Sequence, residues 1–121
     1  MIMTITKLIK TYNFHDSLIT GITHDDLLDQ LVITIEFSFW AQEGFTEGMP
    51  ETGMVNLVFH KVEDFDCAGL NGNVDYFSIL DAIADNNKLS LNILDDFHDK
   101  YFELYIISPD VDFLVIGGER V

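Results

Sequence analysis

Cysteine and basic residues are scarce in this chain. Cys67 is the only cysteine among 121 residues, so the chain can form neither an internal disulfide nor a zinc site built from cysteines. Six residues are basic and 21 are acidic, which gives a net charge of -15. A surface of this sign repels the phosphates of nucleic acids and of anionic lipids, and the sequence contains no phosphate-binding loop motif. The sequence therefore predicts neither a nucleic-acid partner nor a membrane partner.

Long apolar segments are also absent. No stretch approaches the length of a membrane-spanning helix, and the first ten residues lack the apolar run of a signal peptide. Together with the lone cysteine, this pattern predicts a cytoplasmic protein.

Hydrophobic residues, in contrast, make up 48% of the chain. This content is too high for a chain that stays disordered, and the length suits one domain that spans residues 1–121. The acidic excess has two interpretations. It can keep a β-rich protein soluble, or it can attract a basic protein partner.

The clearest strand signal covers residues 31–40. Leu31, Ile33, Ile35, Phe37 and Phe39 alternate with mostly polar residues, which predicts a strand with one buried face. Such an apolar strand would promote aggregation at an open edge, so we place it inside a sheet, between two neighbours. In the preceding strand, near residues 18–23, a glycine at position 21 predicts either a bulge or a close approach of another backbone segment.

Several further alternating segments are separated by turn residues, and no long helix is evident. They cover residues 55–59, 89–93, 101–107 and 111–116. The predicted fold is all-β, with one short helix left open: an antiparallel meander that forms a curved sheet, a sandwich or a partly open barrel. Leu114, Val115 and Ile116 predict a final strand that is covered on both sides. A second copy of the chain could provide this cover, so a homodimer stays open.

Four other segments carry weaker signals. β-branched residues within 3–12 predict a first strand. Asn71 and Gly72 predict a type I′ turn that joins strands near 64–70 and 73–80 into a hairpin. Residues 76–84 fit either a strand or an amphipathic helix, and we favour the strand. Residues 41–53 are rich in glycine and glutamate and predict the longest loop, a candidate contact region.

Dipeptides of histidine and aspartate raise the hypothesis of a metal-dependent hydrolase. The dipeptides are His15-Asp16, His24-Asp25 and His98-Asp99, and one further histidine is His60. They lie at predicted strand starts and turns. Because neighbouring side chains of a strand point to opposite faces, each dipeptide would offer one ligand to a given site. We therefore favour a structural role, and we predict no metal site and no cofactor.

Other catalytic or metal-binding motifs are incomplete. Residues 64–75 have acids at some positions of a calcium loop, but Ala68 and Asp75 break the pattern. Cys67 lies in an apolar strand pattern, and Ser17 lacks a nucleophile-elbow motif. We predict no catalytic residue.

Acidic residues gather at the predicted turns and strand ends. Alternate turns of a meander share one edge, so their charges can combine into a negative edge that attracts a basic partner. Nearby aromatic residues can supply anchors for the contact. The candidate partner-binding residues are Trp40, Glu43, Phe45, Glu47, Asp95 and Asp96.

The stretch Phe14-His15-Asp16-Ser17, the strand at 31–39 and the segments 55–59 and 62–65 resemble parts of a group of small acidic bacterial proteins. Those chains begin with an aromatic-His-Asp-small motif that leads into strands. Some members are uncharacterised, and others are similar to immunity proteins of polymorphic-toxin systems, which bind and neutralise a toxin. The resemblance implies a protein without enzymatic activity. The resemblance implies no catalytic role for the residues that match the family motif, which are Phe14, His15, Asp16 and Ser17.

Three hypotheses follow. The leading one is an immunity-type protein that covers a basic toxin, such as a nuclease, with an acidic face. The second is a metal-assisted hydrolase that uses His15 and Asp16. The third is a structural or regulatory β-domain that self-associates through its last strand.

Overall fold

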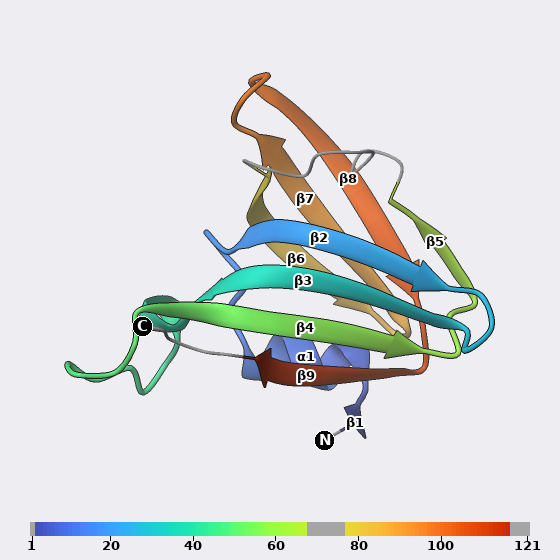
Figure 1. Ribbon diagram of the computed structural model, residues 1–121, viewed down its shortest axis with the longest axis horizontal. Coiled ribbons are helices and arrows are strands. Elements are labelled where there is room, and N and C mark those ends of the chain that lie inside the picture. The colour runs from blue at the N-terminus through green and yellow to red at the C-terminus, as the bar shows by residue number, and fades with distance from the viewer. Residues whose placement is uncertain (1, 68–76, 117–121) are drawn as a thin grey trace.

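The computed structural model describes residues 2–67 and 77–116 (Figure 1). Within them, nine strands form one open, curved antiparallel sheet in the order β1-β9-β4-β3-β2-β6-β7-β8-β5. The strands are β1 (Ile2–Met3), β2 (Leu18–Asp25), β3 (Gln30–Ser38), β4 (Thr52–His60), β5 (Asp64–Asp66), β6 (Phe77–Asp85), β7 (Lys88–Asp95), β8 (Lys100–Ile107) and β9 (Asp110–Ile116). Two helical elements are α1 (Ile5–Thr11) and the 3-10 turn η1 (Phe39–Ala41). The predicted curved antiparallel sheet is confirmed, and it does not close into a barrel.

Strand β3 occupies the interior position predicted for residues 31–40. It pairs with β2 on one side and with β4 on the other. Leu31, Ile33, Ile35 and Phe37 have no exposed surface, because alternate residues of a strand point to one face. The strand ends at Ser38, however, and Phe39 begins the turn η1.

The sheet bends between β2 and β6, which share two residue pairs, Leu18 with Ser78 and Ile19 with Phe77. Both strands contain a register shift near this junction, after Ile19 in β2 and after Ile79 in β6. A bulge increases the local bend of a strand, so the two shifts account for the oblique course of β6, β7 and β8 relative to β2, β3 and β4 (Figure 1). The bulge predicted at Gly21 is confirmed.

The prediction of a first strand over residues 3–12 is wrong. Strand β1 ends at Met3, and α1 follows it with Thr4 as its N-cap, whose hydroxyl accepts a hydrogen bond from the N–H of Lys7 at 3.1 Å. Ile5 and Leu8, one helical turn apart, are fully buried in the core. The helix cap and this burial outweigh the strand preference of the β-branched residues.

The prediction that strands near 64–70 and 73–80 pair with each other as a hairpin is also wrong. Strand β5 pairs with β8, from Asp64 opposite Ile107 to Asp66 opposite Tyr105. Strand β6 pairs instead with β2 and β7. The turn at 71–72 itself lies outside the described residues, as does most of the segment examined for a calcium loop. The choice of strand over helix for residues 76–84 is confirmed over 77–84 by β6.

The last described strand is less covered than predicted. Leu114, Val115 and Ile116 expose 41%, 55% and 39% of their surface. Strand β9 pairs along its length with β4, but β1 pairs with it only at Val111 and Asp112. Among the described residues, β1 lies beside only the first part of β9, and the apolar side chains at 114–116 keep part of their surface exposed. No helix in the described ranges is long and apolar enough to cross a membrane.

Candidate functional site

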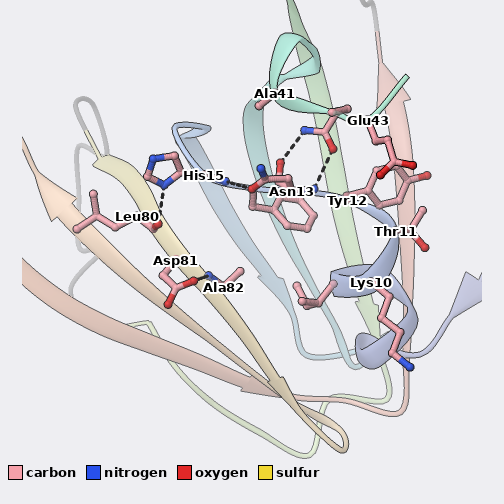
Figure 2. Close-up of a pocket in the computed structure, with 13 residues that line it drawn as sticks. Lys10, Thr11, Tyr12, Asn13, His15, Ala41, Glu43, Leu80, Asp81 and Ala82 are labelled. Carbon is pink, nitrogen blue, oxygen red and sulfur yellow. Dashed lines mark hydrogen bonds between the residues drawn. The ribbon is translucent and has the colours of Figure 1, made fainter. Parts of the chain in front are cut away.

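A polar groove of about 550 Å³ lies where the end of α1, the segment 12–15, the middle of β6 and residues 41–43 meet (Figure 2). Its ionisable side chains are those of Lys10, Tyr12, His15, Glu43 and Asp81. One wall is fixed by Gln42. The side-chain amide of Gln42 donates hydrogen bonds to the carbonyl oxygens of Asn13 at 2.6 Å and Ser38 at 2.9 Å, and its oxygen accepts one from the N–H of Asn13 at 2.8 Å.

His15 is held at this groove by the backbone of β6. Its Nδ1 lies 2.7 Å from the carbonyl oxygen of Leu80 (Figure 2). Because a carbonyl oxygen only accepts, Nδ1 carries the proton and Nε2 is the acceptor in the neutral ring. Nε2 lies 3.5 Å from the carboxylate of Asp16, so protonation of the ring would create an exposed ion pair.

The other residues of the motif at 14–17 join three strands. Asp16 has a left-handed backbone, with φ of 67°, and its N–H donates to the carbonyl of Ile79 at 2.9 Å. Ser17 is fully buried, and its Oγ accepts a hydrogen bond from the N–H of Ser38 at 3.1 Å. Phe14 lies in the core. His15, Asp16 and Ser17 therefore connect this segment to β3 and β6 through hydrogen bonds, and Phe14 packs in the core.

The remaining histidines each pair with a different aspartate. His24 Nδ1 lies 3.2 Å from Asp26, and His98 Nδ1 lies 2.8 Å from Asp95. In neither case is the partner the aspartate that directly follows the histidine. Within residues 2–67 and 77–116, no group of three or more histidine, cysteine or acidic side chains is placed to hold a metal ion.

His60 belongs to a partly buried polar network. Gln30 Nε2 donates to His60 Nδ1 at 3.2 Å, so the proton of the neutral ring is on Nε2, which lies 3.1 Å from Asp112. Burial opposes ionisation of Asp112, but interactions that include the hydrogen bond from His60 outweigh it and lower the pKa of Asp112. The network connects β3, β4 and β9 and is a fold contact.

Cys67 has the properties of an inert thiol. Burial, followed by the charge of Asp66, raises its pKa to about 12. Since the thiolate is the nucleophilic form, very little of the reactive species is present at neutral pH. This agrees with the interpretation of Cys67 as a packing residue.

The six predicted partner-binding residues fall into two separate places. Trp40 lies in η1, and Glu43, Phe45 and Glu47 lie in the loop that follows it. Trp40 is 46% exposed, and Phe45 is half-buried. Asp95 and Asp96 lie at the end of β7, and Figure 1 shows the β7–β8 turn well away from the loop between β3 and β4. A single patch does not include all six.

The turns predicted at 25–29 and 95–99 are confirmed, and both have the sequence Asp-Asp-x-x-Asp, a shared pattern that the sequence analysis missed. In the β2–β3 turn, Asp25 Oδ1 accepts from the N–H groups of Leu27 at 3.0 Å and Leu28 at 3.2 Å. In the β7–β8 turn, Asp95 Oδ1 accepts from the corresponding N–H groups at 3.1 and 3.2 Å. The fifth residue is left-handed in both turns, with φ of 54° at Asp29 and 53° at Asp99.

These turns present large apolar side chains to solvent. Leu27 is 96% exposed, Leu28 64% and Phe97 71%. The turn geometry depends on the aspartates and does not require apolar residues between them. Exposed leucine and phenylalanine at such tips therefore call for another explanation.

A small acidic cavity of about 210 Å³ lies beside the β2–β3 turn. Its lining consists of His24, Asp26, Asp29, Val62, Glu63, Asp64 and Phe65. Every ion pair between described residues includes a histidine, so no described lysine neutralises a carboxylate at contact distance. Asp26 contacts His24 at 3.2 Å, and Asp64 accepts a hydrogen bond from the Tyr105 hydroxyl at 3.0 Å. Because the cavity is lined by four carboxylates and one histidine, it keeps a negative charge that favours an external cation.

Comparison of the chain with protein-family models, curated protein sequences and solved structures finds no match. The function is therefore inferred from the geometry and charge of this chain.

Proposed function

We propose that this protein is a non-catalytic binding domain of the immunity type, which neutralises a basic toxin by covering it with an acidic surface. The net charge of -15 carries this proposal. Such a charge accelerates encounter with a basic protein and disfavours acidic ones. The motif at 14–17 resembles that of a group of small acidic bacterial proteins, some of which are similar to immunity proteins, and this supports the same function.

A role in solubility alone would explain the net charge but not the exposed apolar side chains that lie between aspartates. The turn at 25–29 places the exposed Leu27 and Leu28 between aspartates. Apolar anchors within a charged rim are typical of protein interfaces, whereas a surface selected only for solubility would avoid them. The contacts of Phe14, His15, Asp16 and Ser17 within the fold fit a motif that supports structure rather than catalysis.

The proposed site of action is the cytoplasm of a bacterial cell. A lone cysteine with no disulfide partner in the chain suits a reducing compartment. A toxin that acts inside the cell would be neutralised there before it reaches its target.

The direct test combines binding and protection. The purified protein is mixed with the toxin-like product encoded beside its gene, and the two are also expressed together in cells. We expect a complex that weakens as ionic strength rises, and survival of cells that the second protein alone would kill. Absence of both binding and protection would contradict the proposal.

A second candidate function is self-association, which the exposed end of β9 favours. Leu114, Val115 and Ile116 are apolar and partly exposed, and β1 pairs with only the first part of this strand. A second copy could add a strand here. Sedimentation at several concentrations tests this: a Val115→Lys variant should remain monomeric if the wild-type protein dimerises through β9. A wild-type monomer at every concentration would exclude this dimer.

A further inference from the structure

The β2–β3 turn and the cavity beside it form one continuous feature, here called the leucine tip. It consists of Leu27 and Leu28 at the turn and the carboxylates of Asp26, Asp29, Glu63 and Asp64 around the cavity. The turn is tied to the β4–β5 connection by a hydrogen bond from the N–H of Val62 to the carbonyl of Asp29 at 3.3 Å. The apolar side chains and the cavity are therefore held beside each other.

The conformation of the tip is fixed before any partner binds. Asp25 Oδ1 holds the N–H groups of both leucines, and the left-handed backbone of Asp29, with φ of 54°, closes the turn. His24 adds a wall, since its ring packs edge-on against Phe65 with centroids 4.8 Å apart and its Nδ1 contacts Asp26. A preformed surface loses little conformational freedom on binding, which favours affinity.

The chemistry of the tip selects a particular kind of partner. Four carboxylates around a cavity of about 210 Å³ favour a guanidinium or ammonium group. The leucines, 96% and 64% exposed, add an apolar contact that a small free cation would not need. A second copy of this chain does not suit the tip, because the chain carries 21 acidic and only six basic residues, so it offers few cations to the cavity.

We propose that the leucine tip is the docking surface for the basic protein partner: Leu27 and Leu28 enter an apolar depression of the partner, and an adjacent arginine or lysine of the partner enters the acidic cavity. This inference rests on the proposed function and adds the location of the contact and its chemistry. It also moves the centre of the interface away from Trp40, Glu43, Phe45 and Glu47.

The twin turn at 95–99 offers a matched control. The double variant Leu27→Ser/Leu28→Ser removes the apolar part of the tip, and Phe97→Ser removes the exposed apolar residue of the other turn. Asp26→Asn/Glu63→Gln removes two charges at the cavity, and Asp99→Asn/Glu103→Gln removes two charges on the β7–β8 hairpin. All these side chains are exposed, so the melting temperature of each variant should stay close to that of the wild-type protein.

The measurement is the affinity of each variant for the basic protein encoded beside the gene, by calorimetry at two salt concentrations. We expect Leu27→Ser/Leu28→Ser to weaken binding by about 30-fold or more, as for an interface hot spot, and Phe97→Ser by less than about twofold. Asp26→Asn/Glu63→Gln should weaken binding and reduce its salt dependence, whereas Asp99→Asn/Glu103→Gln should change both much less.

Failure of this inference is distinguishable from failure of the proposed function. If the wild-type protein binds and Leu27→Ser/Leu28→Ser does not change its affinity, the leucine tip is not the docking surface, but the proposed function stands. The same conclusion follows if Trp40→Ala alone abolishes binding. No binding by the wild-type protein, together with no protection of cells, would overturn both.

Discussion

At the scale of single residues, short polar side chains fix the places where strands meet. Ser17 and Ser38 are among the few buried polar residues of the described chain. Both form hydrogen bonds at the junction of β2, β3 and β6, where the N–H of Ser38 donates to Ser17 Oγ. Ser38 Oγ donates to the carbonyl of Asp16 at 3.2 Å. The motif at 14–17 thus connects segments that are distant in sequence.

Removal of the Ser17 hydroxyl should destabilise this junction. In Ser17→Ala the buried N–H of Ser38 loses its acceptor, and an unsatisfied buried donor costs about 1–3 kcal/mol. Urea unfolding of the two proteins measures the difference. Ser78→Ala is a suitable control, because Ser78 Oγ donates to Asp96 in an exposed hydrogen bond and its loss should cost less than about 0.5 kcal/mol. Equal losses in the two variants would contradict this role of Ser17.

The pKa of Asp95 provides a second test at this scale. Desolvation raises it, but hydrogen bonds from the ring and backbone N–H of His98, the charge of His98 and the backbone N–H of Phe97 outweigh this effect and hold the pKa of Asp95 below its usual range. A carboxyl with a lowered pKa stabilises the fold at pH above its unfolded pKa, and this contribution disappears as pH falls through the folded pKa. In a carboxyl NMR titration, His98→Ala should move the midpoint of Asp95 upward. The midpoint of Asp112, which depends on His60, should stay unchanged and serves as the internal control.

At the scale of elements, α1 owes its helical conformation to the core. Seven residues are too few for a stable isolated helix. Ile5 and Leu8 are fully buried, and α1 contacts both β6 and β9, which belong to different parts of the sheet. The helix therefore covers the core between these two strands.

Truncation of Leu8 should show how much this packing contributes. Leu8→Ala leaves a cavity in the core and should lower the free energy of unfolding by about 2–5 kcal/mol. Lys7→Ala, on the exposed side of the same helix, keeps the helical preference and should change stability by less than about 0.5 kcal/mol. Chemical denaturation measures both values. A small effect of Leu8→Ala would mean that α1 does not close the core.

At the scale of the whole molecule, like charges oppose the compact state. The net charge is -15, and the ion pairs between described residues all depend on histidine, so at neutral pH few attractive contacts offset the repulsion. Salt shortens the range of this repulsion, from about 30 Å at 0.01 M to about 10 Å at 0.1 M.

The melting temperature should therefore rise as sodium chloride is increased from about 0.01 M to about 0.2 M. Scanning calorimetry at constant pH measures it. Potassium chloride should produce the same rise, because screening depends on ionic strength rather than on the identity of the cation. A flat or falling curve would show that self-repulsion is a minor term in the stability of this fold.

The sequence predicted the elements whose pattern is local. The alternation in β3 and the glycine bulge in β2 depend on neighbouring residues, and both predictions were confirmed. The first strand was predicted wrongly because the β-branched Ile5, Thr6 and Ile9 favour a strand, whereas the spacing of Ile5 and Leu8 suits one face of a helix. Burial of these two side chains in the core decides for the helix. The partner of β5 depends on where β8 lies, which no turn signal near Asn71 reveals.

For the candidate surface too, the sequence shows some features and only the structure shows the others. The acidic charge and the single inert cysteine are visible in the sequence, as are the two Asp-Asp-x-x-Asp segments. The sequence could not show that Leu27 and Leu28 point outward, since leucine is usually buried, nor that Glu63 and Asp64 lie beside Asp26 and Asp29.

By itself the sequence determined an acidic, antiparallel β-rich domain, because strand alternation and net charge are properties of neighbouring residues and of their sum. The tertiary structure decided which strand edges pair, where α1 enters the core and which carboxylates share a cavity. These outcomes depend on contacts between residues far apart in the chain, and they are settled only when the whole sheet bends around one core.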